Sequence, residues 1–200
     1  MSERRIHRRP SSKPPSAIEA LGEGSNPIDE LHAAHESAAV LLHTGRAAED
    51  PEVTERLVAI TDDVGLPVLA ELWARRPARS LPGALYRLYL LREWTSTDPD
   101  GVAREYTAGI HFAEPSHAVA GAEPPSPDEI RRVADAILRG AFTGDFALAL
   151  ERASAFCHVV VMGRAELARD AEQLGWAGRL QEVARDLDAC ARKWRAGELE

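Results

Sequence analysis

The stretch Ala153-Ser-Ala-Phe-Cys-His-Val-Val-Val-Met-Gly-Arg164 decides the fold class, because it can be interpreted either as a strand or as part of a helix. Three consecutive valines favour a strand on propensity alone. From Asp145 onward, however, apolar residues recur near one face at about 100° per residue. They are Phe146, Leu150, Ala153, Cys157, Val160 and Leu167. This recurrence predicts a helix that begins after Asp145.

The thiol and the imidazole in this stretch are neighbours in sequence, which raises the question of a catalytic pair. Such a pair requires hydrogen-bond contact between the two side chains. Adjacent helical residues do not face each other, so we expect Cys157 to be a buried structural thiol and His158 to point elsewhere. A histidine from another segment stays open as a partner. If the chain reverses near Gly175, Cys157 and Cys190 face inward at similar heights on antiparallel helices.

Helix signals recur on both sides of this stretch. Capping residues closely followed by proline predict starts at Asn26, Asp50, Ser80, Asp98 and Ser126. Glycine predicts ends at Gly65 and Gly140. The last segment carries one apolar seam at steps of four and three, formed by Trp176, Leu180, Val183, Leu187, Cys190 and Trp194. No alternating pattern indicates a strand.

The sequence therefore predicts an all-α protein. We expect a single-domain bundle of about eight helices over residues 26–196, interrupted by a proline-rich connector at 113–126. Residues 1–25 are rich in Ser, Pro, Gly and charge, which predicts a disordered tail. The chain has two cysteines, too few for a disulfide framework. No apolar run approaches the roughly 20 residues of a membrane span, so we expect a cytoplasmic protein.

Charge is distributed unevenly along the 200 residues, whose formal net charge is -8. The tail is basic, and its candidate interaction residues are Arg4, Arg5, Arg8 and Arg9. The remainder is acidic, and binding to nucleic acid needs clustered Lys and Arg on the fold. We therefore expect no nucleic-acid partner except through the tail, which could equally contact an acidic protein.

The sequence contains no recognisable catalytic constellation. It has no nucleophile elbow, phosphate-binding glycine loop or Cys-x-x-Cys pair. His32 and His43 lie about 16 Å apart on one predicted helix, too far to share a metal ion. The spacing of Asp29 and His32 has no partner motif of the kind found in di-iron bundles. We therefore assign no catalytic residue, cofactor or metal ligand, although a pocket around His35 stays an alternative.

The segment Leu81–Trp94 is the densest hydrophobic part of the chain. Its apolar residues extend over more than half of the helix circumference, which is typical of a central helix or of one that contacts a partner. In the second case, the candidate interaction residues are Arg87, Tyr89 and Arg92, because Tyr and Arg are favoured in interfaces.

Three segments resemble a family of small, uncharacterised actinobacterial helical proteins that are sometimes labelled RNA polymerase beta-subunit-like. They are Leu31–Arg46, Leu81–Trp94 and Ala134–Cys157, and the resemblance covers about residues 27–195. It implies a helical fold and an association with transcription, but it supplies no activity and no site residue.

Three hypotheses follow for the function. The first is a non-catalytic cytoplasmic helical protein with an interaction or regulatory role and a protein partner. The second is a transcription-associated accessory factor that contacts RNA polymerase. The third is a helical-bundle enzyme or a ligand or metal carrier. A homodimer formed through the seam of the last helix is compatible with each of them.

Overall fold

Helices account for all the regular secondary structure in the residues that the structure describes. The structure is a computed structural model, and it describes residues 26–48, 50–121 and 126–200. Its elements are α2 (Pro27–Ala47), α3 (Pro51–Val58), α4 (Ile60–Val64), α5 (Leu66–Trp73), α6 (Leu81–Thr97), α7 (Pro99–Gly109), the 3-10 helix η1 (Ile110–Phe112), α8 (Glu114–Ala120), α9 (Pro127–Thr143), α10 (Phe146–Leu167) and α11 (Ala171–Ala196). The predicted all-α class is confirmed.

The expected number of about eight helices was too low, since these ranges contain ten α-helices. The segment after Asp50 divides at Ala59, where ψ is 5° instead of the roughly −40° of an α-helix. Just before this break, the carbonyl of Leu57 accepts a hydrogen bond from the Tyr89 hydroxyl at 2.7 Å. The predicted connector contains α8, while its residues 122–125 and the predicted tail lie outside the described residues.

Helix starts agree with the sequence better than helix ends. A polar side chain accepts a backbone N–H bond, and proline follows within the first turn, at Asn26, Asp50, Ser80, Asp98 and Ser126. Gly65 ends α4 with a φ of 80°. The prediction that Gly140 ends a helix was wrong, because α9 continues to Thr143 and the carbonyl of Gly140 accepts from Gly144 N–H.

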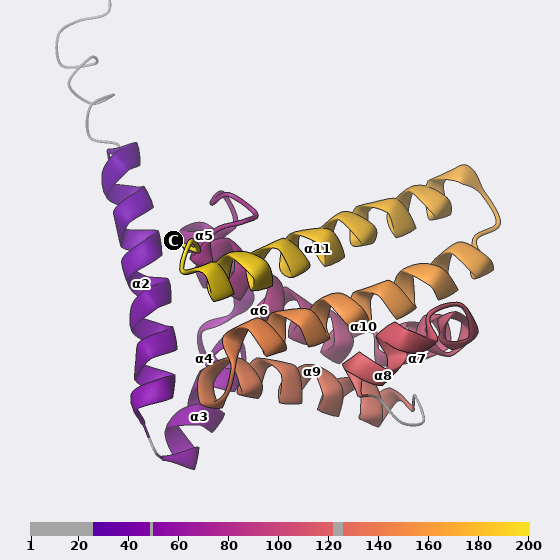
Figure 1. Ribbon diagram of the computed structural model, residues 1–200, viewed down its shortest axis with the longest axis horizontal. Helices are drawn as coiled ribbons and strands as arrows, with labels where there is room; N and C mark the ends of the chain where they lie inside the picture. Colours follow the sequence, from indigo (N-terminus) through magenta and orange to yellow (C-terminus); the bar gives the residue numbers. More distant parts are fainter. Residues whose placement is uncertain (1–25, 49, 122–125) are drawn as a thin grey trace, which may run out of the picture.

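The helix α10 lies at the centre of the bundle and packs against α7, α8, α9 and α11 (Figure 1). It contains the whole stretch 153–164, so the strand interpretation is wrong and the helix is confirmed. The expected single buried face was too narrow. Val159, Val160 and Val161 point in successive directions and are all buried. A helix covered on several sides in this way places most of its β-branched residues in the core.

Length and composition alone would allow α10 to cross a membrane, and no other helix in the described part of the chain meets that test. Its most apolar window is 72% buried inside the bundle. The core helix of a soluble protein has the same length and composition, so this property does not indicate a membrane location.

Two glycines bring the backbones of α7 and α10 into direct contact. A Cβ atom placed on Gly163 of α10 would lie 1.7 Å from the carbonyl oxygen of Glu105, and one on Gly109 of α7 would lie 1.8 Å from that of Val159. Both distances are far below van der Waals contact. Only glycine therefore permits this approach, which fixes α7 against the centre of the bundle.

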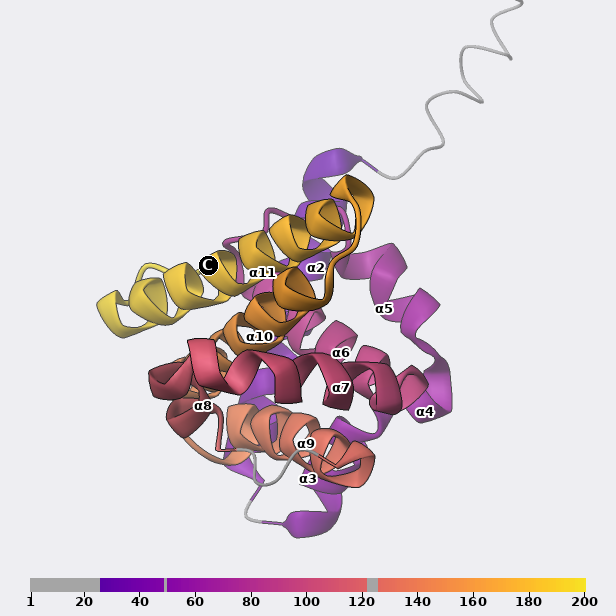
Figure 2. The ribbon, with the colours of Figure 1, turned by 90° about the vertical axis from the view of Figure 1, so that its right-hand side faces the viewer.

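The final two helices form an antiparallel hairpin, which extends from the α2 side of the molecule to the α10–α11 turn at its far end (Figures 1 and 2). The chain reverses at residues 168–170, a little before the expected Gly175. The predicted burial of the seam holds for Leu187 and Cys190. Trp176 is a correction, because this residue lies near the far end of the hairpin and is 45% exposed.

Candidate binding groove

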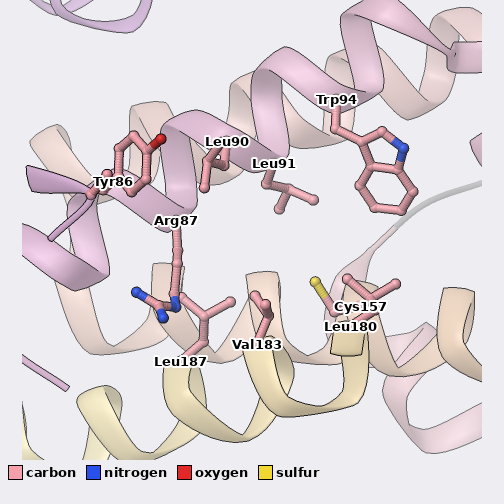
Figure 3. A pocket seen from close by; sticks show the side chains of 10 residues that line it. Tyr86, Arg87, Leu90, Leu91, Trp94, Cys157, Leu180, Val183 and Leu187 are labelled. Carbon is pink, nitrogen blue, oxygen red and sulfur yellow. The ribbon is translucent and has the colours of Figure 1, made fainter. Parts of the chain in front are cut away.

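A cavity of about 300 Å³ opens between α6 and α11, with α10 beneath it (Figure 3). We call it the α6–α11 groove. Its lining residues come from four helices or their ends: Ala74, Tyr86, Arg87, Leu90, Leu91, Trp94, Cys157, Leu180, Val183 and Leu187. The volume lies at the lower end of the range of roughly 300–1,000 Å³ that is usual for ligand pockets.

Helical spacing explains why α6 lines the groove with one side and anchors itself with the other. Tyr86, Leu90 and Trp94 follow one another at steps of four, which places them along one edge of the helix. Leu85 and Leu88 lie on the opposite side and are fully buried in the core. The breadth of apolar sequence in this segment therefore has two causes, a core contact and a groove wall.

On α11, small and large residues have separate places. Ala177, Ala184 and Ala191 recur every seven residues and are buried, and the carbonyl of Ala184 accepts a hydrogen bond from Ser154 of α10 at 2.8 Å. Leu180, Val183 and Leu187 line the groove instead. The alanines let α11 approach α10 closely, while the larger side chains form a wall that faces α6.

Among the described residues that line the groove, Arg87 is the one that is charged. Its side chain extends from α6 toward α11 at the end near Leu187 (Figure 3). One guanidinium nitrogen, Nη1, donates to the carbonyl of Gly83 at 3.0 Å. Another, Nη2, lies 3.6 Å from Asp186 of α11. The buried Nε has no hydrogen-bond partner within the described residues.

Trp94 lies at the opposite end of the groove (Figure 3). The guanidinium of Arg164 stacks over its ring at 5.2 Å, and the same guanidinium donates two hydrogen bonds to Glu105 of α7. This arrangement holds the indole between α6 and α10 and supplies the groove with an aromatic end wall.

Cys157 forms part of the groove floor but is only 1% exposed. Burial raises the pKa of its thiol to about 12, with a small opposing effect from Arg164. A thiolate is the nucleophilic form, so this group is unreactive near neutral pH. His158 lies beside Gln181, with Nδ1 at 3.4 Å from the side-chain amide. The expectation of a buried structural thiol is confirmed, and Cys190 is buried as well.

The predicted interaction residues of α6 have different environments. Arg87 lines the groove. Tyr89 is a correction: its ring is fully buried and its hydroxyl donates to Leu57, so it presents no surface to a partner. Arg92 is mostly buried and binds Asp62 and Asp135, both at 2.8 Å. The remaining candidates, Arg4, Arg5, Arg8 and Arg9, lie outside the described residues.

The histidines of α2 do not form a recognisable metal site. His32 and His35 line a shallow surface depression with Leu31, Glu36 and Glu200. Among residues 26–48, 50–121 and 126–200, no group of three or more His, Cys, Asp or Glu side chains is arranged to hold an ion. The pocket around His35 shares no lining residue with the α6–α11 groove, so it is a separate surface feature.

Sequence reasoning missed the groove itself, although it named Arg87. The available signal was the number of apolar residues in Leu81–Trp94, which is larger than one core face requires.

Comparison with known proteins adds no functional assignment, since no family model matches the chain and no curated protein or solved structure matches it significantly. A protein partner, RNA polymerase included, and a homodimer stay predictions.

Proposed function

We propose that the protein is a non-catalytic binding protein that holds the apolar part of a small molecule in the α6–α11 groove. The observation that carries this proposal is a cavity of about 300 Å³ with an almost entirely uncharged lining. Leu90 at its edge is 37% exposed, and Leu180 and Val183 are half-buried. Covering such surface contributes roughly 25 cal/mol per Å² of apolar area removed from water.

The ends of the groove favour a small molecule over a protein helix. At one end, Arg87 and Asp186 form a bridge from α6 to α11. At the other end, Trp94 is held in place by Arg164. A long helix would extend past both ends and would have to displace Trp94 as well as the bridge, whereas a small molecule can end beside Trp94.

Filling the groove tests the proposal. Val183→Phe adds bulk to the α11 wall, and Val40→Phe makes the same change on α2, where the side chain is 57% exposed and remote from the groove. Titration with 1-decanol, an uncharged probe, is followed by calorimetry. We expect the wild type and Val40→Phe to bind alike, and Val183→Phe to bind at least about tenfold more weakly, a loss of about 1.4 kcal/mol.

Both variants are first checked for a cooperative thermal transition, so that a loss of binding is not a loss of fold. Equal affinity of all three proteins for decanol would place the binding site elsewhere. Absence of binding to the wild type by both decanol and its acid, decanoate, would reject the proposed function.

A further inference from the structure

Arg87 has more hydrogen-bonding capacity than the fold uses. A guanidinium carries five N–H donors, and within residues 26–48, 50–121 and 126–200 Arg87 makes one hydrogen bond, from Nη1 to Gly83. The edge formed by Nε and Nη2 makes no hydrogen bond within the described residues, because Nε is unpartnered and Nη2 is 3.6 Å from Asp186. This edge matches a carboxylate, which accepts two parallel N–H bonds from a guanidinium.

Asp186 does not fully satisfy this edge, because it is shared. Its Oδ1 accepts a hydrogen bond from Arg79 Nε at 2.9 Å, while only its Oδ2 faces Arg87. Two guanidinium groups therefore surround one carboxylate at this end of the groove. The local charge is positive in a protein whose overall charge is -8, and a second carboxylate would balance it.

The position of Arg87 relates this charge to the apolar lining. Its guanidinium lies at the Leu187 end, and the uncharged walls extend from there to Trp94 (Figure 3). Leu180 and Leu187 lie seven residue steps apart on α11, with Val183 between them, which is about 10 Å along a helix. A molecule with an acidic head and an apolar chain has the same arrangement of charge and length.

We propose that the ligand of the groove is a slender apolar molecule with a terminal carboxylate, and that Arg87 binds the carboxylate. This inference rests on the proposed function. The chain lies between α6 and α11 and ends near Trp94. The carboxylate accepts hydrogen bonds from the Nε–Nη2 edge of Arg87, and Arg79 keeps Asp186 paired when Arg87 turns toward the ligand. Arg87 is thus the residue that distinguishes acids from neutral molecules of equal length.

Decanoate and 1-decanol separate the two claims, because they share the chain length and differ in the head group. Calorimetry is performed at neutral pH, below the concentration at which decanoate forms micelles, with the wild type, Arg87→Met and Arg87→Lys. Methionine keeps an unbranched apolar stem without charge, and lysine keeps the charge without the planar fork.

We expect the wild type to bind decanoate at least about tenfold more tightly than decanol. Arg87→Met should bind both probes equally, at the affinity of the wild type for decanol, and Arg87→Lys should retain part of the preference. Decanol binding by Arg87→Met shows that the groove is intact in this variant.

Three results would overturn the inference. Equal affinity of the wild type for both probes would leave an apolar groove with no acid preference, and the proposed function would survive. A preference that persists in Arg87→Met would assign the carboxylate to another residue. Failure of both probes to bind the wild type would reject the small-molecule ligand and the proposed function together, and binding of an amphipathic helical peptide in that case would identify a protein partner instead.

Discussion

Two regions beside α10, the contact with α7 and the space between α6 and α11, are packed in opposite ways. α7 meets α10 with backbone against backbone, because Gly109 and Gly163 have no side chain at the contact. α6 and α11 stand apart over the same central helix, because leucine, valine and aromatic side chains line the space between them. The contact between α7 and α10 leaves no room for a Cβ atom, whereas α6 and α11 enclose a cavity of about 300 Å³.

The difference shows that the size of the side chains between two helices determines whether they pack rigidly or leave space for a ligand. Close packing leaves no place for a ligand, but it fixes the position of a helix. Large apolar side chains that meet no opposing surface leave a cavity whose lining costs stability until something covers it. The closed contact between α7 and α10 therefore supports the central helix that forms the floor of the open groove.

The largest effect is expected from a substitution at the close contact between α7 and α10. Gly163→Ala places a Cβ atom within 2 Å of the Glu105 carbonyl, and the backbone of α7 must move away. Forced overpacking of this kind costs about 3 kcal/mol. We expect the free energy of unfolding, measured in guanidinium chloride, to fall by that amount.

Gly178→Ala is the matched control, since this glycine lies in α11 and the added Cβ would meet nothing within 4 Å beyond the backbone of its own helix and its chain neighbours. The same substitution there should raise stability by roughly 0.5–1 kcal/mol, because alanine restricts the unfolded chain and favours the helix. Similar effects at the two sites would show that α7 and α10 are not in backbone contact.

The second-largest effect is a dependence of stability on pH, which tests whether water is excluded from Cys157 at the floor of the groove. Burial raises the pKa of the Cys157 thiol from 9.0 to about 12. The neutral thiol is therefore favoured in the folded state, so its contribution to stability is complete below pH 9. It is lost as pH rises from 9 toward 12. The expected slope is about 1.4 kcal/mol per pH unit from this one group.

Cys157→Ser isolates that slope, because the serine hydroxyl does not titrate in this range. Burial also raises the pKa of Cys190 to about 11 and of Tyr106 to about 12. The wild type and Cys157→Ser therefore both lose stability at alkaline pH. The difference between their free energies of unfolding should change by about 1.4 kcal/mol per pH unit above pH 9. Parallel curves would mean that water reaches the thiol through the groove.

Local chemistry explains how much of this fold could be predicted from sequence. A capping side chain and a proline act within one turn, so the starts at Asn26, Ser80 and Ser126 were readable. The end of α9 depends on what surrounds it, and Gly140 continues the helix. The burial of all three valines at 159–161 depends on neighbours that only the assembled bundle supplies.

The groove was less predictable than the fold for the same reason. Spacing placed Leu180, Val183 and Leu187 on one face of the last helix, but it did not show that α6 stands apart from that face. Arg87 and Tyr89 were named together as interface residues, yet they lie on different sides of α6. A helix rotation of 200° separates a groove residue from a core residue, and composition does not reveal which is which.

The smallest expected effect concerns Arg164, which contacts both α7, at the close contact with α10, and Trp94, at the end of the α6–α11 groove. Its guanidinium binds Glu105 of α7 through two hydrogen bonds and stacks over Trp94 of α6. Two double-mutant cycles separate these contacts, one with Arg164→Met and Glu105→Gln, the other with Arg164→Met and Trp94→Leu. We expect coupling energies of about 1 kcal/mol for the ion pair and about 0.5 kcal/mol for the stacking contact.

The cycles are measured by urea denaturation, and their ratio is more informative than either value. Coupling to Glu105 alone would assign Arg164 to the closed contact and leave Trp94 free to move, so the groove would lack a fixed end wall. Coupling to both residues would mean that a ligand in contact with Trp94 also affects the contact between α7 and α10 through Arg164. In that case ligand binding should change the stability of α7, which Arg164 contacts through Glu105.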